Sequence, residues 1–413
     1  MRILSGRKAA LDVMRLATRS SNFSALEPKV RSIIGNVRRN GDAALRRYAQ
    51  RWDGLTPNQP LQVSRAEMAE ALNQLPPQAR TSLRQAAQNI RRFAQWQKPK
   101  AWTRDRNGTS LGQLVIPLDS VGCYVPGGRY PLVSTLLMTV IPAQVAGVTN
   151  IRVVSPRSSS EVLAAAAMLG VTELYRIGGA QAIAALAYGT KSIPRVDKIV
   201  GPGNAYVTVA KKLVSFDCAI DFLAGPTEAL VLSETGVPNF IAADLVSQAE
   251  HDPDALSLFI TTKRKLAQKV ASSVTNLSRH HPTARPSLKR SGAILIAESR
   301  DEARDWANQL APEHITVAAD DLPFIRNAGS IFVGDYSPQA AGDYASGPNH
   351  VLPTSSQARF RGGLSVLDFV KLITVQRLSR AGLNQIAPTV ERLAQLEGLA
   401  AHAESVRVRS AHA

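Results

Sequence analysis

Hydrophobic positions recur three and four residues apart through most of the first hundred residues. The segments 29–52 and 65–97 show this spacing, which is typical of amphipathic helices. Pro76 and Pro77 interrupt the second segment and predict two helices there. The first twenty residues are Arg-rich and amphipathic, but Asp12 and the lack of an apolar run favour a short helix of the folded protein over a targeting peptide.

From about residue 119 the pattern changes to an alternation of strands and helices. Short runs of β-branched and other apolar residues are each followed by a helical stretch. Strands are expected at 120–125, 150–156, 173–179 and 198–204, and in a second series at 229–234, 256–262, 293–299, 315–319 and 331–335. This alternation predicts an α/β fold with two parallel sheets, with ligands at the carboxyl ends of the strands. The tail from about 364 is expected to be helical again.

Length and charge exclude several classes of protein. A chain of 413 residues suits two or three domains, and none of its apolar runs approaches the roughly 18 residues of a membrane span. The net charge of +17 comes from Lys and Arg spread along the chain among acids. A solvated basic surface is therefore favoured over a nucleic-acid-binding protein, although such a field can attract an anionic dinucleotide.

The two cysteines, Cys123 and Cys218, are too few for a disulfide framework or a structural zinc site. Both lie among apolar residues, which predicts small buried side chains in a reducing, cytoplasmic setting.

Residues able to bind a metal or move protons gather in the second half of the chain. Gln248 and His251 are three apart in a helical pattern, so both can face one metal ion. By themselves they are explained as well or better by the polar face of a helix. Asp343 and His402 could supply further ligands.

A second set of residues is suited to proton transfer. Glu313 and His314 are adjacent where a helix is expected to give way to a strand, and a neutral-range imidazole beside a carboxylate can act as a base. A helix-end histidine in solvent explains this pair equally well. The segment GDYASGPNH, which ends in His350, is also compatible with an ordinary polar turn.

Three Gly-rich strand ends are candidates for binding phosphate groups. They are YVPGG from Tyr124, IGGAQ ending at Gln181 and GPGN ending at Asn204, each at the start of an expected helix. The strict GxGxxG motif is absent from the chain. Tight strand–helix turns without a ligand are an equal alternative.

Taken in order, nine segments resemble the histidinol dehydrogenase family: VGCYVPGG, LLMTVIPAQVAGV, IGGAQAIAALAYGT, KIVGPGNAYV, AGPTE, DLVSQAEH, APEH, GDYASGPNH and EGLAAH. The resemblance runs from about residue 115 to the end and more loosely through the N-terminal helices. It implies two Rossmann-like domains in an intertwined homodimer, and oxidation of L-histidinol to L-histidine with zinc and two NAD per turnover. The implied units are an N-terminal helical arm (1–20), a metal and substrate domain (21–124 with 228–363), an NAD domain (125–227) and a helical tail (364–413).

The resemblance also implies a role for each matching residue. His314 matches the base for alcohol oxidation and Glu313 the acid/base that activates water for the aldehyde step. The metal ligands implied are Gln248, His251, Asp343 and His402; the NAD contacts are Tyr124, Gln181 and Asn204; the substrate contacts are Thr227, His350 and Glu397 together with His314 and the four metal ligands. The C-terminal tail, with Glu397 and His402, is implied to complete the site of a partner subunit.

Two departures from the family pattern keep another substrate open. Thr227 stands where Ser is expected, and the loop RYPL after YVPGG is about two residues short. A related group similar to sulfopropanediol dehydrogenase acts on a sulfonated diol, so that substrate is the alternative. A metal hydrolase using Glu313 as base is a further alternative, and it predicts activity without NAD.

Overall fold

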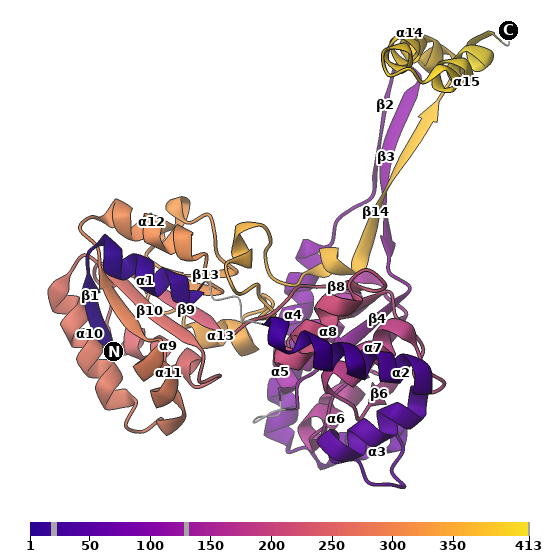
Figure 1. Cartoon of the computed structure of the whole chain (residues 1–413). Helices are drawn as coiled ribbons and strands as arrows, with labels where there is room; N and C mark the ends of the chain where they lie inside the picture. The colour runs from indigo at the N-terminus through magenta and orange to yellow at the C-terminus, as the bar shows by residue number, and fades with distance from the viewer. Residues whose placement is uncertain (18–22, 128–131, 412–413) are drawn as a thin grey trace.

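Two α/β lobes and a projecting arm make up the protein in this computed structural model, which describes residues 1–17, 23–127 and 132–411 (Figure 1). Residues 2–17 and 228–344 form one lobe, and residues 27–97 and 120–220 form the other; the segment after residue 344 leads back to the second lobe and the arm. No helix among the described residues is both long and apolar enough to cross a membrane.

The first lobe is built on a parallel sheet that contains six strands in the described ranges. Their order is β1 (Arg2–Ser5), β11 (Ala293–Ile296), β10 (Leu256–Thr261), β9 (Glu228–Leu232), β12 (His314–Val317) and β13 (Ser330–Val333). The helices are α1 (Arg7–Ala17), α9 (Pro238–Ala249), α10 (Arg264–Leu277), α11 (Arg285–Arg290), α12 (Arg300–Leu310) and α13 (Gln339–Tyr344). Apolar side chains of α1 and α12 cover one face of the sheet and those of α9, α10 and α11 the other.

The second lobe has a parallel sheet in which the described residues form five strands. Their order is β6 (Glu173–Tyr175), β5 (Asn150–Val154), β4 (Ser120–Tyr124), β7 (Lys198–Val200) and β8 (Ala219–Ile220). The helices are α2 (Glu27–Tyr48), α3 (Arg65–Gln74), α4 (Pro77–Gln97), α5 (Val133–Ala146), α6 (Ser160–Met168), α7 (Gly179–Tyr188) and α8 (Ala205–Val214). Helices α3 to α6 pack on one face, and α2, α7 and α8 pack on the other.

The arm is an antiparallel sheet in the order β14 (Val370–Leu378), β3 (Thr109–Pro117) and β2 (Trp102–Arg106), tipped by α14 (Arg380–Leu396) and α15 (Ala400–Ala411). Figure 1 shows that it extends away from both lobes. Large apolar side chains lie exposed along it: Leu111, Leu114, Leu372, Ile373, Val375, Leu393 and Leu396. Exposed apolar surface of this extent is uncommon on monomeric soluble proteins.

The expected α/β class with two parallel sheets is confirmed, and so is the burial of both free cysteines. The unit boundaries differ from those expected. Strand β4 is central to the second sheet, and α2 to α4 pack on that sheet, so residues 27–124 do not belong with 228–363. The expected N-terminal arm instead contributes β1 and α1 to the first lobe. Residues 18–22 lie outside the described ranges.

The helical tail expected from residue 364 is wrong for residues 370–378. This segment, VKLITVQRL, is strand β14, paired antiparallel with β3 along its whole length. Its β-branched residues favour extended backbone. Strands β2 and β3 were missed because this arm has almost no buried face to impose a regular apolar pattern.

Candidate active site

Glu313 and His314 lie where β12 begins, in the strand next to the β13 edge of the first-lobe sheet. Ala311, in the left-handed conformation, ends α12, and three residues later the chain enters the sheet between β9 and β13. Both side chains are buried. They sit at the amino end of the strand, so the expected location at the carboxyl ends is wrong for this sheet.

The carboxylate of Asp343 joins two of the predicted site residues. Asp343 lies on α13, and its Oδ2 accepts a hydrogen bond from Gln248 Nε2 at 2.9 Å. Its Oδ1 lies 3.4 Å from His314 Nε2. Asp343 thereby brings together Gln248 and His314, which lie 95 and 29 positions before it in the sequence, in one cluster buried between α9, α13 and β12.

Burial and neighbouring charge set the proton affinities of this cluster. Burial raises the pKa of Glu313 to about 7, although its Oε2 accepts the Glu228 backbone N–H at 3.1 Å. Desolvation lowers the pKa of His314, but the carboxylates of Glu313 and Asp343 outweigh it and leave the pKa above its ordinary value. Burial opposes ionisation of Asp343, yet its hydrogen bond and charge interaction with His314 hold its pKa low. At neutral pH, Glu313 and His314 can therefore each hold or release a proton.

His314 has one ring nitrogen without a partner. Its Nδ1 is buried and makes no hydrogen bond, and the Glu313 Oε2 lies 3.8 Å from it. Phe332 stacks beside the ring at 6.0 Å between centroids and restricts its orientation. A buried nitrogen left unbonded costs stability, so its retention indicates a ligand or a proton that arrives during function.

Other predicted site residues lie around this cluster with fewer contacts. His350 is 2.7 Å from the Asp343 carbonyl through Nδ1 and 3.4 Å from Thr135 Oγ1 on α5 through Nε2. It thus lies between the lobes. Burial lowers its pKa. Thr227 directly precedes β9 and is half-buried. His251 is exposed in the turn after α9.

The expectation that Gln248 and His251 share a helix is only partly confirmed. Helix α9 ends at Ala249, so His251 lies beyond it, although the His251 N–H still bonds back to the Gln248 carbonyl at 3.4 Å. His251 stays close enough for its charge to affect Asp343.

An amide, an imidazole and a carboxylate in one buried cluster suit a borderline metal such as zinc. The described part of one chain, however, holds no group of three or more His, Cys, Asp and Glu residues arranged to bind a metal. The residues fit a metal in chemical type, but their arrangement in the described part of the chain is not by itself that of a metal site.

The two remaining candidates, Glu397 and His402, lie far from this cluster in the same chain. Glu397 caps the end of α14 and His402 lies on α15, both exposed at the tip of the arm. Figure 1 shows α14 and α15 at the far end of the arm, well away from α13 in the first lobe. Folding of a single chain therefore does not bring them into the site.

Tyr124, Gln181 and Asn204 line a single cleft of about 450 Å³ in the second lobe. The Tyr124 hydroxyl accepts the Gly179 N–H at 3.0 Å, and Asn204 Oδ1 accepts two N–H groups as the N-cap of α8. Here the prediction of ligand loops at the carboxyl ends of strands agrees with the structure, because the cleft opens after β4 and β7. Residues 128–131, which contain most of the shortened loop, lie outside the described ranges.

The sequence reasoning missed residues of both sites. Asp53 lies in the cleft and accepts hydrogen bonds from Gly178 N–H (3.0 Å) and Gln181 Nε2 (3.2 Å). Glu228 lies against Glu313; it is fully buried, and one of its carboxylate oxygens has no partner. The only signal for Glu228 was an acidic residue within an apolar strand pattern, and Asp53 had none beyond its place before a glycine.

Asp53 makes stability depend on pH in a defined direction. Burial raises its pKa to about 6, so the folded state favours the protonated form. Its contribution to stability is present below its ordinary pKa of about 4 and is lost as the pH rises through about 6. Asp53→Asn removes this titration while keeping an acceptor for Gly178.

We expect the melting temperature of Asp53→Asn, relative to the unmodified protein, to rise between pH 4.5 and 7.5. The corresponding change is at most about 3 kcal/mol. Thermal unfolding at several pH values measures it, with the exposed Asp335→Asn as the control for loss of a surface charge. A difference in melting temperature between the two proteins that does not change with pH would contradict the assigned titration of Asp53.

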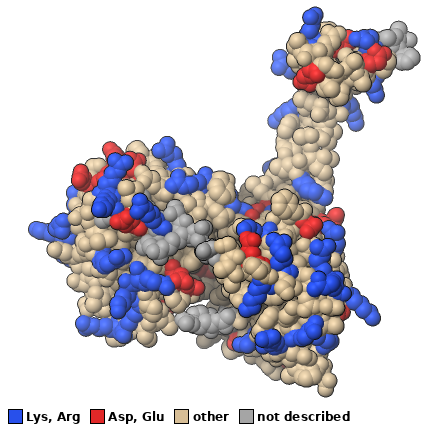
Figure 2. Space-filling model, in the orientation of Figure 1, with Lys and Arg blue, Asp and Glu red and all other residues tan. Residues whose placement is uncertain are grey.

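Positive charge covers both lobes and the arm without forming a single stripe on the face shown in Figure 2. Lys and Arg alternate there with Asp and Glu. This distribution agrees with a solvated basic surface.

Comparison with known proteins identifies relatives over almost the whole chain. A family model described as histidinol dehydrogenase matches residues 16–410. A histidinol dehydrogenase of Methanothermobacter thermautotrophicus is 50% identical over 92% of this chain and 92% of its own. One from Geobacter metallireducens is 46% identical over 93% and 92%.

Among solved structures, the histidinol dehydrogenase of Elizabethkingia anophelis superposes with a TM-score of 0.92 at 34% identity. The match covers 99% of this chain and 98% of that one. The arm and both lobes therefore recur in that structure.

Proposed function

The chain belongs to the histidinol dehydrogenase family, and on that premise we propose that it oxidises L-histidinol through L-histidinal to L-histidine at the end of histidine biosynthesis. The observation that carries the proposal is the buried cluster of Glu313, His314 and Asp343, in which two groups can exchange protons at neutral pH. The family consists of NAD-dependent oxidoreductases, and a cleft suited to a dinucleotide lies in the second lobe.

We assign the bound groups to the two sites already described. Tyr124, Gln181 and Asn204 would contact NAD⁺, and Gln248, His251, Asp343 and His402 would hold zinc. When bound, NAD⁺ would accept hydride, and zinc would help to orient the substrate.

The protein's own residues then move the protons. His314 takes the hydroxyl proton during oxidation of the alcohol, and Asp343 beside its Nε2 stabilises the charged imidazole. Glu313, with a pKa of about 7, accepts a proton from water as water adds to the aldehyde. Thr227 and His350 lie where they can contact the substrate between the lobes, and burial of the cluster keeps bulk water from the aldehyde.

We further propose that the active protein is a homodimer whose arms exchange. The exposed apolar residues of the arm, among them Leu372 (47% exposed) and Leu396 (77%), need a partner surface, and a second copy supplies it. In that assembly Glu397 and His402 reach the other subunit's cluster. His402 adds the missing metal ligand and Glu397 a carboxylate for the substrate amine.

The strongest competing substrate is a sulfonated diol, which Thr227 and the shortened loop leave open. Glu397 argues against it, because a further carboxylate in the site would repel a sulfonate and attract an amine. We place the protein in the cytoplasm, and its two free thiols support this.

The metal assignment leads to a direct test. Prolonged chelation is expected to lower the rate of NADH formation from L-histidinol at least about 100-fold, because the metal no longer orients the substrate. Added zinc should restore the rate. Activity is measured with L-histidinol or a sulfonated diol, each with and without NAD⁺. Turnover of the diol alone would overturn the substrate assignment.

A further inference from the structure

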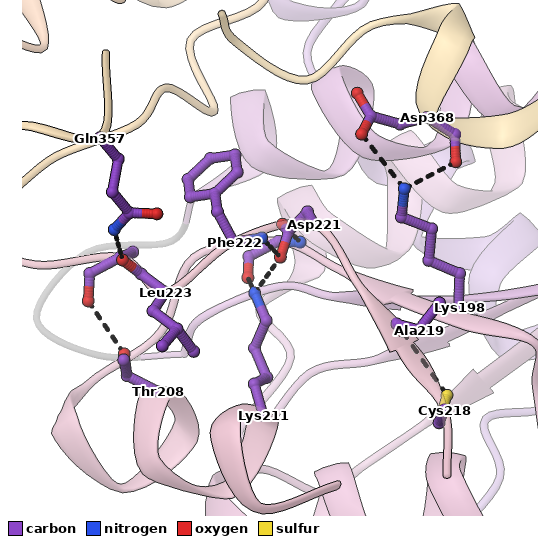
Figure 3. Close-up of polar contacts among 12 residues, drawn as sticks. Lys198, Thr208, Lys211, Cys218, Ala219, Asp221, Phe222, Leu223, Gln357 and Asp368 are labelled. Carbon is purple, nitrogen blue, oxygen red and sulfur yellow. Dashed lines mark hydrogen bonds and ion pairs between the residues drawn. The ribbon is translucent and has the colours of Figure 1, made fainter. Parts of the chain in front are cut away.

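A buried ion pair lies directly beneath the GPGN loop of the second lobe. Lys211 on α8 pairs with Asp221, which follows β8, and their side chains are only 2% and 0% exposed. Figure 3 shows Lys211 extending from its helix to the Asp221 carboxylate. Because two charges lose their hydration here, the pair requires compensating hydrogen bonds from the protein.

The compensating hydrogen bonds converge on Gly201. Its N–H donates to Asp221 Oδ2 at 2.7 Å, and its carbonyl accepts from Lys211 Nζ at 3.0 Å. The pair therefore fixes both peptide planes that flank one residue. Two apolar side chains of similar size could fill the same space, but they could form a hydrogen bond with neither the N–H nor the carbonyl of Gly201.

Gly201 occupies a tightly restricted position next to the cofactor cleft. Its φ is +112°, and a Cβ atom there would lie 2.2 Å from the Tyr124 carbonyl oxygen. The loop then runs three residues to Asn204, which caps α8. Tyr124 and Asn204 both line the cleft, so the orientation of Gly201 determines how two walls of the cleft are spaced.

The same pair is connected to the segments that cross between the lobes. Asp221 Oδ1 also accepts the Phe222 N–H at 2.6 Å, and Arg361 from the returning segment donates to the Asp221 carbonyl. Gln357 Nε2 donates at 2.6 Å to the Leu223 carbonyl, two residues after Asp221 (Figure 3). Movement of the pair would therefore disturb the loop and the crossing segments together.

We propose that Lys211 and Asp221 are positioning residues for the dinucleotide: by holding both peptide groups of Gly201 they keep Tyr124 and Asn204 at the spacing that binds it. Neither side chain is itself placed among the lining residues of the cleft. The inference rests on the proposed function in taking NAD⁺ as the ligand of this cleft.

The test replaces the pair with apolar side chains of similar size, Lys211→Met with Asp221→Leu. This variant avoids an unpaired buried charge. The dissociation constant of NAD⁺, measured by calorimetric titration, and the KM for NAD⁺ are expected to rise about tenfold or more, with kcat at saturating NAD⁺ and the KM for L-histidinol within about threefold of normal. A purely structural role would change the melting temperature without this selective loss.

Arg152→Met is the matched control, because it removes a partly buried ion pair with Glu173 in the same sheet, away from the GPGN loop. Its NAD⁺ affinity should stay unchanged. If the apolar variant does not fold, Lys211→Met with Asp221→Asn is used instead; it keeps an acceptor for the Gly201 N–H and should show a smaller loss.

An NAD⁺ affinity within twofold of normal in a folded variant would overturn the role of the pair. Failure of the proposed function would look different, because the unmodified protein itself would then bind no NAD⁺ or form no NADH from L-histidinol.

Discussion

His314→Asn is expected to lower kcat for L-histidinol by roughly 10²- to 10⁴-fold, because the alcohol then lacks a group to take its proton as hydride leaves. The imidazole is buried with a pKa above its ordinary value, and asparagine cannot accept a proton at that position. The shorter amide does not reach Asp343 as Nε2 does, so the melting temperature is measured alongside the kinetics to show that the variant is folded. Steady-state kinetics with L-histidinol and with L-histidinal as separate substrates measure the effect.

Glu313→Gln is the companion variant. Its kcat for oxidation of the aldehyde should fall more than its kcat for oxidation of the alcohol, because the aldehyde step needs a base to activate water. His280→Asn, which replaces an exposed histidine of the first lobe, is the control. Equal loss of both steps in both variants would contradict the separate roles of Glu313 and His314.

Mixed dimers are expected to regain activity that neither parent has. Asp343→Asn damages the cluster in the first lobe, and His402→Ala damages the arm, so each homodimer should be almost inactive. A mixed dimer pairs one intact cluster with one intact arm. Random pairing of equal amounts should therefore restore about a quarter of the normal activity, because half the dimers carry one complete site of two.

The matched control mixes two variants of the same lobe, Asp343→Asn and Gln248→Ala. Every site in such a mixture carries a damaged cluster, so no activity should return. Co-expression with two different affinity tags allows the mixed dimers to be isolated and assayed. Inactive mixed dimers in the first experiment would show that His402 does not act on the partner's site.

The sequence pattern predicted most strands of the two sheets because strands in the middle of a sheet are buried on both faces between helices, whereas the more exposed edge strands β1 and β8 were missed. Continuous apolar runs such as those of β9 and β10 result from that burial. The arm could not be predicted in this way. Strand β14 is exposed along nearly its entire length, so no packing within the chain imposes a regular apolar pattern on it.

The candidate site was predictable in its residue types but not in its geometry. The spacing of Gln248 and His251 suggested a shared helix face, yet α9 ends between them. Local sequence did not show that Asp343 would meet Gln248 and His314, because that contact depends on packing of α13 against α9 and β12. Burial beside a cleft gives three further residues their roles, and local sequence does not show that burial either; they are Asp53, Lys211 and Asp221.

The most direct test of the central claim is the amount of NADH formed from a limiting, known quantity of L-histidinol with excess NAD⁺ and zinc. A four-electron oxidation predicts about two NADH per histidinol, with L-histidine as the product. One NADH per histidinol with L-histidinal released, or no NADH from a folded, zinc-loaded protein, would contradict the account.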